Sequence, residues 1–383
     1  MCYNLFMEHR TVRLRLHPKN KEKNALLYGT ADACRFVWNL AVQKLRDEYE
    51  WTGKSDYSYF TLAKWFTTLR NQNPWLSQYS ANNVKVSLKS LETTYKKFFE
   101  YKEAGLPKFK GKYNSTPCFP LADKLAFRVN KNSSAMCIQK IGWMRLNGAN
   151  MYGHLKPVCG QVKNERGKWY VYLTYKVDSE ENTNEKVVGI DRNVNQIALS
   201  DERIIETPDI KKLIKKKNKY QRQMSRRKKG SRRRLISQRR MKKAWGKIVN
   251  IRNNWAHQVS REIANGYGSV AIEDLKTKNM TRKRRSRKTL NRLILESCWG
   301  VLEQKLSYKT HVEKVDPRYT SQLCNECGER GIRKSRSFYC DSCDKEAHAD
   351  INAAKNIRDR GIDSLSKALK GVGPELADLR QVA

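Results

Sequence analysis

Three acidic residues on three separate predicted elements could together form a metal-dependent catalytic site. Asp191 follows the apolar residues 187–190, Glu273 follows the apolar residues 270–272, and Asp350 opens a segment with helical periodicity. Apolar runs of this length are typical of buried strands, so two of the carboxylates would lie at strand ends. Three converging carboxylates can hold two Mg²⁺ ions, the arrangement that hydrolyses phosphodiesters. Taken singly, each acid is more typical of a strand end or a helix cap.

The charge of the chain indicates a polyanionic partner. Lys and Arg number 78 against 38 Asp and Glu, a formal net charge of +40 over 383 residues. This excess is larger than solubility requires, and it favours nucleic acid as the partner. A membrane surface is the competing polyanion, but the sequence has no long uncharged apolar stretch and no signal peptide. We therefore expect a soluble intracellular protein of two or more domains, without a membrane partner.

Four of the ten cysteines are spaced as zinc ligands. They form two CxxC pairs with twelve residues between them: Cys324, Cys327, Cys340 and Cys343. Each pair offers two thiolates from one tight turn to a tetrahedral ion, and a reducing compartment disfavours the alternative of disulfides. With four protein ligands there is no open coordination position, so we expect one structural zinc ion that holds a small lobe folded.

A strongly basic run lies between the first two acids. Residues 211–243 contain 18 Lys or Arg and no Asp or Glu, and a second cluster occupies residues 282–288. The run is typical of a solvated basic helix or a disordered arm, and it could also bind phosphates beside the acidic site. Our candidate nucleic-acid contacts are Arg226, Arg227, Lys228, Lys229, Arg232, Arg233, Arg234, Arg239, Arg240, Arg284 and Arg285. No GxxxxGK[ST] loop is present, which argues against a nucleotide-driven motor.

The N-terminal half reads as a β unit interrupted by helices. Residues 11–17 alternate apolar and basic side chains, residues 25–103 have helical spacing, and strand patterns return over residues 108–178. The helical block is rich in aromatic residues, which could pack in its core or stack on bases. They are Trp38, Trp51, Tyr57, Tyr59, Phe60, Trp65, Phe66 and Trp75.

The order of the C-terminal motifs resembles the TnpB family, accessory proteins of bacterial insertion sequences and relatives of the type V CRISPR effectors. The motifs are Gly189-Ile190-Asp191-Arg192, Ile272-Glu273-Asp274-Leu275, Tyr319-Thr320-Ser321-Gln322-Leu323-Cys324, the second CxxC pair, and Asp350-Ile351-Asn352-Ala353-Ala354-Lys355. Weaker similarity in the N-terminal half extends the resemblance over nearly the whole chain. It includes Arg35-Phe36-Val37-Trp38-Asn39 and Leu106-Pro107-Lys108-Phe109-Lys110-Gly111.

The resemblance implies an RNA-guided, Mg²⁺-dependent DNA endonuclease. Asp191, Glu273 and Asp350 match the catalytic positions of the family, and the four cysteines match its zinc ligands. The implied partners are a guide RNA encoded near the transposon end and double-stranded target DNA next to a short transposon-adjacent motif, with sequence read by base pairing. The implied location is the cytoplasm of a prokaryote, in association with the nucleoid.

The implied fold is multidomain α+β, with a barrel-like wedge domain, a helical recognition lobe inserted into it, and an RNase H-like (RuvC) nuclease domain that carries a zinc ribbon. The implied boundaries are residues 1–24 and 106–180 for the wedge, 25–105 for the recognition lobe, 186–317 and 347–383 for the nuclease domain with a C-terminal tail, and 318–346 for the ribbon.

Two positions depart from the family pattern. His348-Ala349 stand where the family often has an acidic residue and an arginine, and Asn193 replaces a commonly small residue. Neither changes the three acids, which disfavours a nuclease-dead, guided repressor. Two alternatives remain: a non-catalytic nucleic-acid-binding protein, which metal-dependent cutting would exclude, and a compact type V CRISPR effector, which a neighbouring repeat array would reveal.

Overall fold

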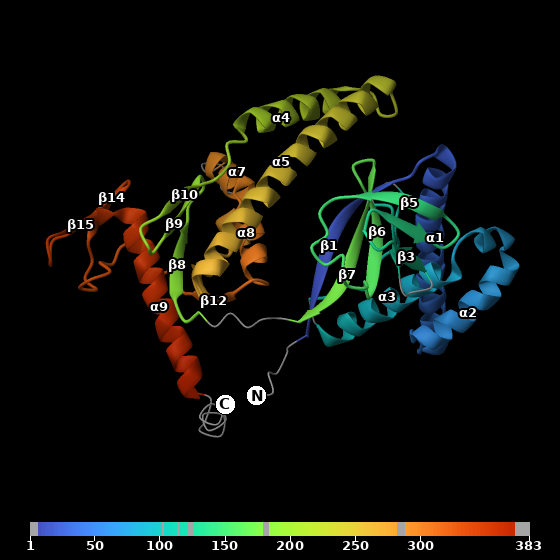
Figure 1. Cartoon of the computed structure of the whole chain (residues 1–383), viewed down its shortest axis with the longest axis horizontal. Coiled ribbons are helices and arrows are strands. Elements are labelled where there is room, and N and C mark those ends of the chain that lie inside the picture. The colour runs from blue at the N-terminus through green and yellow to red at the C-terminus, as the bar shows by residue number, and fades with distance from the viewer. Residues whose placement is uncertain are drawn as a thin grey trace. The chain divides into compact units, whose positions relative to one another are not determined.

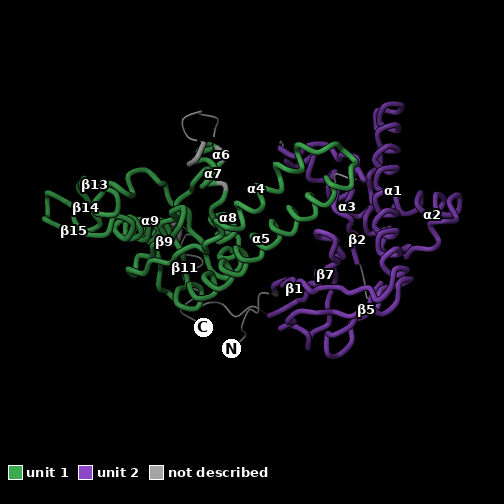
Figure 2. The backbone as a smooth tube through the Cα atoms, turned by 90° about the horizontal axis from the view of Figure 1, so that it is seen from above, with its two compact units in different colours: residues 1–2, 181–383 green, residues 3–180 purple. Residues whose placement is uncertain are grey.

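A computed structural model describes residues 7–101, 103–112, 115–121, 126–178, 184–281 and 288–371. The chain divides into two compact units, one comprising Tyr3–Glu180 and the other Glu181–Ala383 with the first two residues (Figure 2). Each unit has its own hydrophobic core. Among the described residues, no helix is both long enough and apolar enough to cross a membrane.

The N-terminal unit is built on a seven-stranded antiparallel sheet in the order β2-β6-β7-β1-β5-β4-β3 (Figure 1). Its strands are β1 (Met7–His17), β2 (Cys118–Leu121), β3 (Phe127–Val129), β4 (Ala135–Ile138), β5 (Gly142–Asn147), β6 (Cys159–Glu165) and β7 (Lys168–Asp178). In the described part of the chain the edge strands β2 and β3 do not pair with each other. The expected barrel-like domain is therefore a curled but open sheet.

In the sequence, helices come between β1 and the other six strands. They are α1 (Lys21–Thr52), α2 (Tyr59–Gln72), the short 3₁₀ helix η1 (Pro74–Gln78) and α3 (Ala81–Glu100). The side chain of Asn20 caps the start of α1, and Gly53 ends it with a left-handed φ of 68° that suits glycine. The helical periodicity of the sequence is thus confirmed. Of the aromatic residues, Trp38 and Phe66 are buried, whereas Trp51 and Phe60 are 88% and 77% exposed.

The C-terminal unit contains a mixed five-stranded sheet in the order β10-β9-β8-β11-β12. Its strands are β8 (Val187–Arg192), β9 (Gln196–Leu199), β10 (Ile204–Glu206), β11 (Ser269–Glu273) and β12 (His311–Val315). Strands β8, β11 and β12 are mutually parallel, while β9 and β10 are antiparallel to their neighbours. Because β8 and β11 are parallel neighbours, their carboxyl ends meet at one edge of the sheet.

Helices cover both faces of this sheet. Between β10 and β11 come α4 (Lys211–Arg226) and α5 (Arg232–Gly266), and between β11 and β12 come α6 (Thr277–Met280), α7 (Lys288–Glu296) and α8 (Trp299–Leu306). Apolar residues of α5 and α8 pack against Val188, Ile190 and Ile272 on one face. Helix α9 (Ala349–Gly371) lies against the other face, where Ile357 packs on Ala271.

Two glycines let α9 approach the sheet closely. A Cβ atom on Gly189 of β8 would lie 2.0 Å from the carbonyl oxygen of Ala354, and one on Gly361 of α9 would lie 2.4 Å from the Cβ of Ala271. Neither position can hold a larger residue without moving the backbone. This close approach brings the start of α9 to the carboxyl edge of β8 and β11.

A small three-stranded antiparallel sheet lies between β12 and α9 in the sequence. It consists of β13 (Ile332–Lys334), β14 (Ser337–Cys340) and β15 (Lys345–His348). Its core is very small, because only Cys324, Phe338, Cys340 and Ala349 are clustered and buried there. A lobe with so little apolar burial needs another source of stability, which a metal ion can provide.

Candidate functional site

The alternation of β8 and β11 places two of the three predicted acids on the face that α9 covers. On β8, Val188 and Ile190 face α5 and α8, so Asp191 faces the opposite side together with Gly189. Glu273 follows the same rule on β11, because Ala271 contacts α9. Ile272 pairs with Ile190, and the next residues along the two strands are the two acids. Asp350 is the second residue of α9 and completes the group, which we call the acidic centre.

The electrostatics of Asp191 show that the three carboxylates interact. Burial, and after it the negative charges of Glu273 and Asp350, raise the pKa of Asp191 to about 7, against the opposing effects of Arg333 and a hydrogen bond from Asn193. Asp191 is 9% exposed and Asp350 is 4% exposed. Like charges held together in a poorly solvated site favour a bound cation, which would relieve their repulsion.

Each carboxylate is also oriented by protein donors. Asn193 Nδ2 donates to Asp191 Oδ2 at 3.0 Å, and Thr320 Oγ1 donates to Glu273 Oε1 at 2.6 Å. Asp350 accepts two bonds, from Gln196 Nε2 at 2.9 Å and from Arg333 at 2.7 Å. The departure from the family pattern at Asn193 therefore has a clear role, because its amide orients Asp191.

The chemistry of these donors fits Mg²⁺, although the centre is not closed around a single point. Within the described ranges, only the four cysteines meet the condition that three or more ligand atoms of His, Cys, Asp or Glu lie within 4.8 Å of one another. The three acids do not all lie this close to one another. Carboxylate oxygens are the ligands that Mg²⁺ prefers, and it usually retains several waters, so such spacing suits ions that share the centre with water and a phosphate.

Three residues near the acids were not singled out from the sequence. Arg333 lies on β13, Thr320 precedes the first CxxC pair, and Gln196 opens β9. Arg333 is one of 78 basic residues, and nothing in its neighbours sets it apart. Thr320 lies in the motif Tyr319-Thr320-Ser321-Gln322-Leu323-Cys324, which resembles the TnpB family but does not by itself indicate a contact with an acid. Their contacts depend on tertiary folding, and no periodicity signals them.

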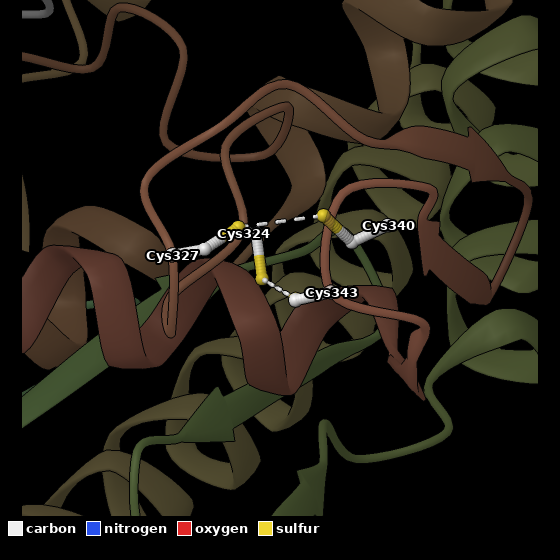
Figure 3. A group of neighbouring side chains, drawn as sticks. All are labelled: Cys324, Cys327, Cys340 and Cys343. Carbon is white, nitrogen blue, oxygen red and sulfur yellow. Dashed lines mark hydrogen bonds between the residues drawn. The ribbon is translucent and has the colours of Figure 1, made fainter.

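The four cysteines form a compact group in the small lobe (Figure 3). The sulfur atoms of Cys324 and Cys343 are 3.6 Å apart, and those of Cys327 and Cys340 are 3.5 Å apart. Tetrahedral zinc with bonds of about 2.3 Å would place its sulfurs about 3.8 Å apart. The spacing is too long for disulfides and fits the zinc site that the sequence predicts.

The basic run forms a helical hairpin in which α4 and α5 lie side by side (Figure 1). Arg227 donates to the backbone of Arg233, and Arg234 donates to the backbone of Met224 and Arg227, so these two guanidinium groups fasten the turn. The other candidate residues of the hairpin are exposed: Arg226, Lys228, Lys229, Arg232, Arg233, Arg239 and Arg240. Arg284 and Arg285 lie outside the described residues.

A second basic surface lies on the seven-stranded sheet, on the side away from buried Leu14 and Leu16. We call it the basic sheet face, and its residues are Arg13, Arg15, His17, Arg145, Lys168 and Tyr170. Burial, together with the charges of Arg15, Arg145 and Lys168, lowers the pKa of His17. The guanidinium carbon of Arg13 lies 3.7 Å from the centre of the Tyr170 ring. Concentrated cations beside an aromatic ring suit phosphates and bases.

Three known families match parts of this chain. The family described as "Probable transposase" matches residues 170–284, and "Cas12f1-like, TNB domain" matches residues 299–357. Together these two segments contain every candidate metal ligand. "Helix-turn-helix domain" matches residues 7–54. In this structure that segment is strand β1 followed by the single helix α1, so the name does not describe its fold here.

Full-length relatives are similar over both units. "Putative RNA-guided DNA endonuclease InsQ" of Escherichia coli (strain K12) is 33% identical over 361 residues, which cover 85% of this chain and 86% of that protein. "Putative RNA-guided DNA endonuclease" of Streptomyces pristinaespiralis is 26% identical over 387 residues, covering 96% and 92%. The solved structure of the mini-RNA-guided endonuclease CRISPR-Cas_phi3 is 11% identical with a TM-score of 0.47, covering 94% of this chain and 93% of that one.

Proposed function

The chain belongs to the TnpB family of RNA-guided DNA endonucleases, and from this premise we propose that it hydrolyses target DNA at Asp191, Glu273 and Asp350. The observation that supports the proposal is the placement of the three acids: Asp191 and Glu273 end two parallel, neighbouring strands on the face that α9 covers, and Asp350 lies at the start of α9. The strand order, in which three antiparallel strands are followed by two parallel ones, supports an RNase H-like nuclease domain.

The side chains of the acidic centre divide the work of binding and orientation. Asp191, Glu273 and Asp350 would hold two Mg²⁺ ions, which when bound would activate water and stabilise the departing 3′ oxygen, leaving a 5′ phosphate. Asn193 and Gln196 keep two of the carboxylates oriented. Arg333 brings a permanent positive charge to the acidic centre. Once Arg333 releases Asp350, its guanidinium group could pair with the scissile phosphate.

The four cysteines would hold one structural zinc ion. The lobe that they occupy contains little apolar core, and its β13 carries Arg333 into the acidic centre. Zinc would therefore support the reaction indirectly, by keeping Arg333 in place. In the domain division that we propose, this lobe is the zinc ribbon inserted into the nuclease domain.

Two surfaces would hold the nucleic acids. The exposed cations of the α4–α5 hairpin and the basic sheet face offer contacts to phosphates, while base pairing between guide RNA and target DNA reads the sequence. The seven-stranded sheet would act as the wedge domain, and the helices α1, α2 and α3 inserted into it would act as the recognition lobe. The protein would work in the cytoplasm of a prokaryote, on DNA of the nucleoid.

The proposal is tested with protein that is expressed from its gene together with the flanking DNA, so that an RNA encoded beside the gene is made in the same cells. RNA that copurifies should be sequenced, and a DNA target matching its guide segment should be cut when Mg²⁺ is added. Glu273→Gln should bind the same RNA and target and leave the DNA intact. Cutting by Glu273→Gln at the wild-type rate would place the active site elsewhere, and absence of a defined RNA would contradict guidance.

A further inference from the structure

Thr320 connects the zinc lobe to the acidic centre. It lies four residues before Cys324 and is only 2% exposed. Its hydroxyl is 2.6 Å from Glu273 Oε1 and 3.1 Å from the backbone oxygen of Pro317. A hydroxyl group has one proton to donate, and the charged carboxylate is both the nearer and the stronger acceptor. The hydrogen bond therefore goes to Glu273.

Thr320 is itself held in place by helix α9. Asn356 Nδ2 donates to the backbone oxygens of Thr320 at 2.9 Å and Leu323 at 2.7 Å. One turn earlier on the same helix, Asn352 donates to Leu323 at 2.7 Å and accepts from the backbone of Asn325 at 3.1 Å. We call residues 320–325 the strap. Helix α9, which begins with Ala349 and Asp350, thus fixes the strap through Asn352 and Asn356, which lie one turn apart.

Without Thr320, little would keep Glu273 in the centre. Its side chain is long and half-buried, with water within reach, and its charge and that of Asp191 repel each other. Rotation toward solvent would relieve this repulsion. A hydrogen bond to Oε1 opposes the rotation by anchoring one oxygen, and an oriented carboxylate loses less freedom when it binds a metal ion.

We propose that Thr320 is a positioning residue that holds Glu273 in the acidic centre and thereby sets the affinity of the centre for Mg²⁺. This inference rests on the proposed function, because it assumes that Glu273 is a metal ligand. Thr320 does not touch the reacting atoms. Its effect should consequently appear in the Mg²⁺ requirement rather than in the rate at saturating Mg²⁺.

The test compares Thr320→Val, which keeps the shape and removes the donor, with Thr320→Ser, which keeps the donor. Two quantities are measured: the Mg²⁺ concentration that gives half the maximal thermal stabilisation of RNA-free protein, and the concentration that gives half-maximal cleavage by RNA-loaded protein. Loss of one hydrogen bond to a charged group predicts an increase of about tenfold in both for Thr320→Val. Thr320→Ser should stay within about twofold of wild type. Cleavage at saturating Mg²⁺ should stay within about threefold in both variants, because neither side chain touches the reacting atoms.

The outcomes separate the inference from the proposed function. A Thr320→Val protein that loses thermal stability with an unchanged Mg²⁺ midpoint would make Thr320 merely structural and overturn the inference. Equal defects in Thr320→Ser and Thr320→Val would do the same, since the hydroxyl would then be irrelevant. If Thr320→Val does not fold, Thr320→Ala must show the tenfold change instead. A wild-type protein that responds to Mg²⁺ in neither assay would overturn the proposed function itself.

Discussion

Replacing Asp191 with asparagine should make the metal-free protein more stable at alkaline pH. The buried carboxyl of Asp191 lies beside two other acids, and these surroundings raise its pKa from the ordinary 3.8 to about 7. The folded state therefore binds a proton more tightly than the unfolded state. The stabilisation from that proton is complete below pH 3.8 and is lost as the pH rises through 7. Asparagine has the same shape and never ionises.

The structure sets the size of the effect. A difference of about three pH units between the folded and unfolded pKa corresponds to about 4 kcal/mol. At pH 8, without Mg²⁺, Asp191→Asn should exceed the wild type in free energy of unfolding by about this amount. For a unit of this size, this raises the melting temperature on the order of 10 °C. At pH 5 the advantage should fall to less than half.

Thermal unfolding of RNA-free protein at pH 5 and pH 8 provides the assay. Asp274→Asn is the matched control, because it makes the same change at an exposed acid next to Glu273, and it should stay within about 0.5 kcal/mol of wild type. Excess Mg²⁺ should then stabilise the wild type and leave Asp191→Asn unchanged. An Asp191→Asn protein no more stable than wild type at pH 8 would refute the reasoning that burial and the neighbouring charges of Glu273 and Asp350 raise the pKa of Asp191.

Three further outcomes are expected. Asp350→Ala should abolish cleavage while binding of guide and target stays within a few-fold of wild type in a gel-shift assay, because the basic surfaces are untouched. Cys340→Ser should lower the amount of bound zinc, measured by elemental analysis. It should also raise the Mg²⁺ requirement for cleavage, because the strap that positions Glu273 ends at the zinc lobe. Wild-type protein that folds normally without zinc would contradict this prediction. Burial raises the pKa of the Cys34 thiol to about 12, so an alkylating reagent at pH 8 should modify the exposed Cys159 before Cys34. Mass spectrometry measures the order of labelling, and faster labelling of Cys34 would contradict its burial.

The sequence predicts the main parts of the acidic centre because they depend on local patterns. Asp191 and Glu273 end apolar runs, and period-two alternation then decides which face of the sheet each occupies. The helical periodicity after Asp350 is equally local. The CxxC spacing predicts the cysteine group because each pair lies within one tight turn.

The contacts that complete the centre depend on pairing between distant segments, which no local pattern encodes. Arg333 on β13 reaches Asp350 on α9, and Thr320 reaches Glu273 across 47 residues. The open edges of the N-terminal sheet have the same origin, because alternation predicts a strand but not its neighbour. The basic run shows a third case. Its composition indicated a solvated basic helix or a disordered arm that could bind phosphates, but it did not indicate the hairpin turn that Arg227 and Arg234 fasten.

Guide-dependent cutting tests the central claim most directly. A chain with a net charge of +40 adheres to any polyanion, but that adhesion weakens steeply as salt rises, whereas target choice by base pairing persists. Protein loaded with its own RNA, at near-physiological salt and with Mg²⁺, should cut a matched double-stranded target. It should fail when the guide is mismatched in the segment next to the flanking motif. RNA-free protein that cuts matched and mismatched DNA equally well would contradict RNA guidance and leave only a metal-dependent nuclease.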